Sequence, residues 1–306
     1  RRLHAHRMGR ANCQVGVATF TLNAVNIGTF PLGEADRIVV LFSRERGLHR
    51  AVAKGARKPG SKMAGKSEPL TINRYLLAQG KSLDIVTQCE TLESFPMLRR
   101  DLERLTYALY FAELSQVFGQ ELSEDAANYF EKLSLAIGFM ADGEKAPALQ
   151  CLEFELLVLG MLGLSPELTF CVGCRETAVD RNIAAFNYEL GGVVCQNCLK
   201  RLRKGENEHG QVPMVAEVQA REGRLVSVFL TPMVWRQLIL AKTASQASAD
   251  LQNLGEAEAF ASSSGGFTRE DGQAASRLAQ ALRLMLGYIE YKSGRRMRSL
   301  EVLSTL

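Results

Sequence analysis

Two pairs of cysteines, "CVGC" at residues 171–174 and "CQNC" at residues 195–198, constrain this chain more than any other feature. Each pair is a CxxC knuckle, and twenty residues separate the two pairs. This spacing is typical of a zinc site with four thiolate ligands, and the alternatives are a redox dithiol pair or unrelated cysteines. Four thiolates complete the tetrahedral coordination of zinc and leave no open position for water. The sequence therefore predicts one structural zinc ion per chain, bound by Cys171, Cys174, Cys195 and Cys198.

The cysteine content also bears on the cellular compartment. The 306-residue chain contains seven cysteines, an odd number, and is too long to need disulfide bonds for its stability. Its basic N-terminal segment lacks the apolar core of a signal peptide, and we assign no role to residues 1–12. The longest strongly apolar run, residues 156–164, is shorter than the ~18 residues of a membrane span. We expect a protein of the reducing cytoplasm without a membrane partner.

The first part of the chain has the character of β-structure. Short segments rich in β-branched and aromatic side chains alternate with turn-forming segments at residues 28–35, 44–47, 57–69 and 80–82. Five short strands separated by such turns predict a small barrel or sandwich. The segment 57–69, between the third and fourth strands, is the long and basic one.

Helical periodicity begins after Phe95 and Pro96. Apolar residues at helical spacing, with capping and breaking residues between them, predict further elements on both sides of the cysteines. These are helices at residues 97–118, after Ser123, from Pro147 to Gly163, and from Thr231; a strand at residues 223–230; a loose Ala/Ser-rich connection at residues 244–266; and a last helix at residues 271–291, followed by a basic tail.

These patterns predict a multidomain α+β protein. We expect a small β-barrel at residues 16–95 and an α-helical domain formed by residues 96–166 and 230–306. Residues 167–229, which contain the four cysteines, are expected to form a zinc-binding insertion that resembles a zinc ribbon.

Residues 60–67, "GSKMAGKS", match the P-loop pattern G-x-x-x-x-G-K-[ST]. A P-loop needs a buried strand before it and a helix after it, so that backbone N–H groups face the phosphates. Here the preceding segment is basic and contains Pro59, and Pro69 follows closely. We therefore interpret the match as accidental. No other catalytic motif is present, and we do not expect an enzyme.

Positive charge is concentrated in one block. From Arg37 to Arg74 there are ten lysines and arginines against two glutamates, a local charge of +8 in a chain whose net charge is +4. A flexible basic loop can follow a phosphate backbone without reading bases, whereas the alternative is a solvated loop with surplus lysines. The candidate DNA-binding residues are Arg37, Lys54, Arg57, Lys58, Lys62, Lys66 and Arg74.

Aromatic side chains near this block could stack on bases of a single strand. The candidates are Phe20, Phe30, Phe42 and Tyr75. A small barrel also needs aromatic residues in its core, so for each of them a core position is the stronger expectation.

Several segments together resemble the RecO family of bacterial recombination mediators and DNA repair proteins. They are "GEADRIVVLFSRERG", "AVAKGARKPGS", "SLDIVTQCETLESFPMLRRDLERLTYALYFAEL" and "LGLSPELTFCVGC" followed by "VVCQNC". The resemblance runs from about Thr21 to Cys198 and is weaker in the C-terminal helical part.

The resemblance implies an N-terminal OB-fold, a helical domain and a zinc-binding insertion. It places the family's basic OB surface on Arg37, Lys54, Arg57, Lys58 and Lys62, and its zinc ligands on the four cysteines. It also implies a cytoplasmic, nucleoid-associated protein that binds single- and double-stranded DNA and anneals complementary strands without ATP. With RecR it would load RecA onto DNA coated by single-strand-binding protein (SSB), whose acidic C-terminal peptide it would bind. The alternative is a zinc-ribbon RNA-binding or transcription-associated module.

Overall fold

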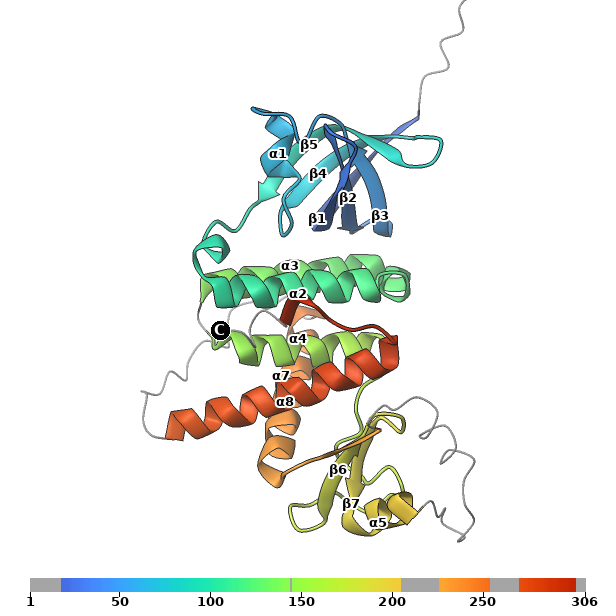
Figure 1. The fold of residues 1–306 in the computed structure, drawn as a ribbon, viewed down its shortest axis with the longest axis vertical. Helices are drawn as coiled ribbons and strands as arrows, with labels where there is room; N and C mark the ends of the chain where they lie inside the picture. The colour runs from blue at the N-terminus through green and yellow to red at the C-terminus, as the bar shows by residue number, and fades with distance from the viewer. Residues whose placement is uncertain (1–17, 144, 205–225, 254–269, 301–306) are drawn as a thin grey trace, which may run out of the picture.

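The computed structural model describes residues 18–143, 145–204, 226–253 and 270–300. Within these ranges the chain forms three successive tiers along its long axis: a β-barrel, a set of packed helices, and a small β-module that carries α5 (Gln196–Lys204) (Figure 1). In these ranges no helix is long and apolar enough to span a membrane.

Five strands close into an OB-like barrel in the order β1-β2-β3-β5-β4. Neighbours in this barrel are antiparallel except β3 and β5, whose parallel pairing closes the wall. The predicted barrel is thus confirmed. Its strands are β1 (Thr19–Leu32), β2 (Asp36–Ser43), β3 (Gly47–Ala53), β4 (Ile72–Ala78) and β5 (Asp84–Glu93), and the short helix α1 (Lys62–Lys66) lies between β3 and β4.

The first strand is longer than its sequence suggests. The Gly/Pro-containing segment 28–35 was expected to be a turn, but β1 continues through it to Leu32. A register shift between Asn26 and Gly28 marks a bulge that bends the strand. A Cβ on Gly28 would lie 2.9 Å from the side-chain amide of Gln116, so a larger residue here would displace the Gln116 side chain that joins the strand to the helices.

The barrel and the helices share one apolar core. Phe42 of β2 meets Tyr129 with their ring centroids 4.8 Å apart, and the two planes are nearly perpendicular. Polar contacts fix the same interface, because Gln116 Nε2 donates to Ile27 O over 2.6 Å and Leu48 N donates to Ser123 Oγ over 2.9 Å. The barrel is therefore held in one orientation on the helices.

The helical tier is built on α4, which is covered by α2, α3, α7 and α8. The helices are α2 (Leu102–Val117), α3 (Ala126–Asp142), α4 (Pro147–Met161), α7 (Pro232–Asn253) and α8 (Glu270–Ser293), with 3-10 turns η1 (Leu98–Arg100) and η2 (Glu121–Asp125). Pro147 opens α4, and Gly163, at φ +68°, follows its end, both as expected from the sequence.

One expectation for this tier is wrong. The Ala/Ser-rich segment 244–266 was expected to be a loose connection, but α7 continues through it to Asn253. Alanine has the highest helix propensity, and the serine content does not outweigh it. Residues 254–266 lie outside the described ranges. Of the strand expected at residues 223–230, the structure shows β8 (Ser227–Phe229).

A carboxyl group is buried at the centre of the helices. The Oε1 atom of Glu155 on α4 accepts a hydrogen bond from the hydroxyl of Tyr110 over 2.7 Å, and its Oε2 has no hydrogen-bond partner within the described residues. Burial raises the pKa of Glu155 to about 8, although the hydrogen bond from Tyr110 opposes this shift. Glu155 is therefore protonated in the folded protein at neutral pH.

This raised pKa predicts a pH-dependent stability. The unfolded chain loses the Glu155 proton near its ordinary pKa of about 4.3, whereas the folded chain keeps it until about pH 8. Stability should therefore fall as the pH rises between these values. Denaturant unfolding should be measured at pH 6.0 and 7.5. Between these values the free energy of unfolding of the wild type should fall by up to about 2 kcal/mol more than that of Glu155→Gln, which cannot titrate at this position. An equal loss in both proteins would contradict the assignment.

Candidate metal centre and nucleic-acid interface

The four cysteines of the two CxxC pairs meet at one point. Cys171 and Cys174 lie on the loop before β6 (Ile183–Asn187), Cys195 ends β7 (Gly192–Cys195), and Cys198 lies in α5 (Gln196–Lys204). All four Sγ atoms are within 4.8 Å of one another. This is the one group of at least three metal-ligating side chains within the described part of the chain.

The distances suit a tetrahedral metal ion. Zinc–thiolate bonds of about 2.3 Å place neighbouring sulfur atoms about 3.8 Å apart in an ideal tetrahedron. The Sγ atoms of Cys174 and Cys195 are 3.8 Å apart. None of the cysteines in the described residues forms a disulfide bond, so all four thiols are available as ligands. The cluster can hold a metal ion, and its four sulfur donors favour zinc among the common metals.

Hydrogen bonds around the sulfur atoms prepare them for negative charge. The backbone N–H of Cys195 donates to Cys171 Sγ over 3.3 Å, and Arg201 donates to Cys198 Sγ over 2.9 Å. Such donors stabilise thiolates and orient the ligands of a metal. A Cβ on Gly173 would lie 3.0 Å from Cys198 Sγ, so glycine lets the first knuckle close on the second.

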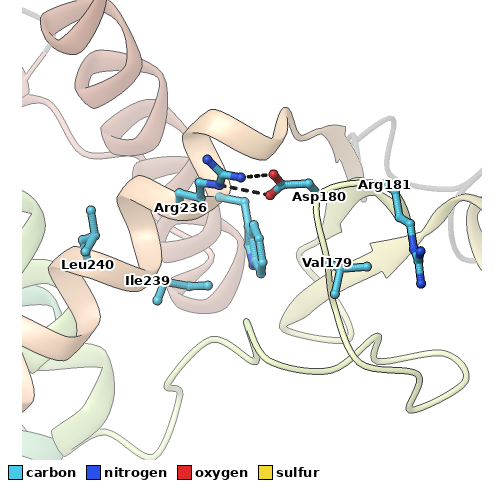
Figure 2. Close-up of a pocket in the computed structure, with 7 residues that line it drawn as sticks. Val179, Asp180, Arg181, Arg236, Ile239 and Leu240 are labelled. Atoms are coloured by element: carbon cyan, nitrogen blue, oxygen red, sulfur yellow. Dashed lines mark hydrogen bonds and ion pairs between the residues drawn. The ribbon is translucent and has the colours of Figure 1, made fainter.

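The cysteine module is fixed to the helices through α7. Trp235 donates from its indole N–H to Leu168 O over 2.8 Å, and Arg236 forms a bidentate ion pair with Asp180 (Figure 2). A groove of about 710 Å³ lies between the loop that carries Val179 and the exposed side of α7 at Leu240. The module therefore has a defined position at the end of the molecule away from the barrel (Figure 1).

Loss of one thiolate should release the metal. In Cys174→Ser, the zinc-to-protein ratio should fall from one to well below one, and the module should unfold at lower temperature, because zinc ligation contributes ~10–16 kcal/mol in small peptides. Cys174 is only half-buried, so the substitution removes little packing. The matched control is Cys89→Ser, which changes a free cysteine of the barrel outside the cluster.

Metal analysis and thermal melts of both variants measure this effect. Wild-type protein that contains no zinc, or equal zinc content in Cys174→Ser and the wild type, would overturn the assignment of the metal centre.

The basic segment after β3 presents most of the candidate DNA-binding side chains to solvent. It turns at Gly55 and Gly60, both at positive φ, and forms the short α1, whose N-cap is Ser61. The exposed side chains in and beside this segment are Lys54, Arg57, Lys58 and Lys62. Arg57 also donates to Gly33 O, which ties the segment to the turn between β1 and β2.

Three other candidates are engaged by protein groups. Arg37 pairs with Glu68 over 3.1 Å and donates to Ser67 Oγ over 3.0 Å. Lys66 donates from Nζ to the backbone oxygen of Cys89. Arg74 lies on the outer face of β4 and contacts Glu90 over 3.4 Å.

The P-loop-like segment, residues 60–67, does not have the geometry of a phosphate-binding loop. Lys66 is bound to β5, and the Ser67 side chain is buried and donates to Ala64 O. The residues that would bind phosphate and Mg²⁺ in a P-loop are therefore used inside the protein. The five-residue α1 follows a loop instead of a buried strand.

The four candidate aromatic side chains divide between core and surface. Tyr75 is buried inside the barrel and Phe42 is buried between the barrel and the helices, so both are core residues, as expected from the sequence. Phe20 is half-buried beneath the guanidinium of Arg46, which lies 3.9 Å from its ring centroid. Phe30 is 50% exposed near the end of β1. Only Phe30 presents a free ring of the kind that stacking on a base requires.

Comparisons with known proteins agree with this architecture. Residues 17–95 match the family model described as Recombination protein O N terminal, and residues 99–210 match Recombination protein O C terminal. DNA repair protein RecO of Symbiobacterium thermophilum is 34% identical over 242 residues, which cover 72% of this chain and 95% of that protein. The protein of the same name from Nostoc punctiforme is 29% identical over 296 residues, covering 92% and 94% of the two chains. This chain belongs to the RecO family of DNA repair proteins.

Proposed function

We propose that this protein is a recombination mediator that binds DNA through the basic segment of its barrel and anneals complementary strands without ATP. The observation that carries the proposal is the exposed set Lys54, Arg57, Lys58 and Lys62 on a closed OB-like barrel. A groove or surface of this kind on an OB barrel is typical of single-strand binding. Family membership supports a role in DNA repair.

Annealing follows from charge alone. Two complementary strands repel each other through their phosphates, and a cationic surface that neutralises both lowers this barrier without nucleotide hydrolysis. Phosphate contacts carry no sequence information, so the protein can anneal complementary strands of any sequence. The Lys66 and Ser67 side chains, which are used inside the protein, are consistent with a mechanism that does not bind ATP at this segment.

The partners follow from the family. We infer that the protein acts with RecR to load RecA onto SSB-coated strands, and that it contacts the acidic C-terminal peptide of SSB. Such a contact would place the protein on coated DNA, where it must compete with SSB for the same phosphates. The cysteine cluster would hold a structural zinc ion, because four thiolates leave no coordination site for a substrate. We further infer that the protein acts in the cytoplasm, at the nucleoid.

The basic segment can be tested by charge removal. Lys54, Lys58 and Lys62 are exposed, so their replacement by glutamine should leave folding nearly unchanged. If each contacts a phosphate, the log–log salt slope of single-strand binding should flatten by about 2, at roughly 0.7 per contact. The measurement is a salt titration on two unrelated oligonucleotides, with annealing of SSB-coated complementary strands followed in parallel. Arg57 is kept because it also holds Gly33 O.

A matched control removes three exposed charges elsewhere: Arg99, Lys200 and Arg283, each replaced by glutamine. This control should keep the wild-type slope and annealing rate. An unchanged slope in the barrel variant, or a defect confined to one sequence, would place the DNA elsewhere. Failure of the wild type to anneal SSB-coated strands, combined with binding to structured RNA, would favour the RNA-binding alternative.

A further inference from the structure

A second cationic site lies at the end of α8, between the barrel and the cysteine module (Figure 1). Residues 292–298 contain no acidic residue and four basic ones, which are Lys292, Arg295, Arg296 and Arg298. Within the described residues no carboxylate lies within 4 Å of the guanidinium of Arg295 or Arg298, although the chain contains ion pairs of this kind elsewhere. The guanidinium groups of Arg295 and Arg298 are therefore available to an anionic partner, whereas Lys292 donates to Glu189 O over 3.0 Å.

The segment after α8 is held in place by its backbone. Met297 is buried, and its N–H donates to Glu290 Oε1 over 2.8 Å. The N–H groups of Arg298 and Ser299 donate to the two carboxylate oxygens of Glu113 on α2, each over 2.8 Å. These two neighbouring acids thus bind backbone groups, and the arginine side chains are presented from a fixed segment.

An aromatic pocket of about 330 Å³ opens beside these arginines. Tyr188, Glu290 and Tyr291 line it together with Arg295 and Arg296. The rings of Tyr188 and Tyr291 have centroids 6.1 Å apart. A pocket of this size, with aromatic walls and guanidinium groups at its edge, fits one nucleotide. The carboxylate of Glu290 can accept a hydrogen bond from an exocyclic amino group of a base.

Arg295 connects this pocket with the barrel. It also lines a polar cleft of about 630 Å³, whose barrel side includes His49 and Arg50 of β3. The cleft contains two carboxylates as well: Asp84 of β5, which pairs with His49 over 3.0 Å, and Glu121 on the helical side. Ala51 and Ala53 point into the barrel core, so Arg50 lies on the outward face of β3, and Lys54, directly after the strand, continues that face. Arg50 and Arg295 therefore lie on the same cleft, and Arg50 lies on the strand face that leads to Lys54 of the basic segment.

We propose that a single strand of nucleic acid bound at the barrel continues across this cleft and places one base in the pocket of Tyr188 and Tyr291. Arg295 contacts the phosphate next to that base. The inference rests on the proposed function, because it extends a strand that the barrel already holds. It makes the binding site longer than the barrel alone and involves both halves of the chain.

The test compares oligonucleotide lengths. Wild type, Arg295→Gln and Tyr291→Leu are titrated with mixed-sequence single strands of about 8 and about 30 nucleotides, since an OB barrel alone covers roughly 4–16. On the long strand, Tyr291→Leu should bind roughly 5- to 150-fold more weakly, as expected for one lost stacking contact, and Arg295→Gln should flatten the salt slope by about 0.7. On the short strand both should bind like wild type.

Two controls separate binding from folding. Tyr291→Phe keeps the aromatic face and should retain wild-type affinity on the long strand, and thermal melts should match across the set. If Arg295→Gln and Tyr291→Leu bind the long strand as tightly as the wild type, this inference is wrong. The same result is expected if these cations bind an acidic peptide instead of a nucleic acid. If the variant with glutamine at Lys54, Lys58 and Lys62 nevertheless binds single strands more weakly than the wild type, the proposed function is supported and only this extension is wrong.

Discussion

One continuous apolar core holds the three tiers of this protein together. It begins on the outer side of the barrel wall at Val25, Ile27, Val40 and Phe42, passes through α2 and α4, and reaches Phe186 of the cysteine module. Burial of apolar area is the dominant favourable term in folding, and a core shared between tiers removes the freedom that separate domains would keep. The basic segment of the barrel and the cationic end of α8 are therefore displayed at fixed positions on one body.

The cysteine module depends on this core and on its ligands in different ways. Its own apolar cluster has only Cys171, Val194, Cys195 and Cys198 as buried members, which is too little to stabilise a separate fold. A metal on the four sulfur atoms would supply the missing free energy locally. Contacts of Trp235 and Arg236 then position the module against α7. Metal loss should consequently affect this end of the molecule more than the barrel.

Electrostatics would govern both the strength and the reversibility of the proposed DNA binding. In the proposed function, the exposed lysines would gain affinity for DNA from counterion release, a contribution that falls steeply with salt and is the same for every sequence. The remainder of the chain carries a small net negative charge, because the block from Arg37 to Arg74 exceeds the net charge of the whole. This uneven charge distribution would confine the proposed DNA binding to the basic surfaces instead of spreading it over the protein.

The sequence by itself determined the features that depend on neighbours along the chain. The spacing of the four cysteines identified the cluster, the alternation of residues identified the barrel, and Pro147 and Gly163 marked the ends of α4. Local patterns suffice there because side-chain periodicity and backbone conformation set these elements.

Only the tertiary structure decided which charges are available and which rings meet. Lys66 and Arg37 look like their exposed neighbours in the sequence, yet each is bound by a group brought close through barrel closure. Tyr188 and Tyr291 are about a hundred residues apart in the chain, and nothing local indicates that they share a pocket with Arg295. Such sites arise from long-range packing, in which shape and burial of distant segments choose the contacts.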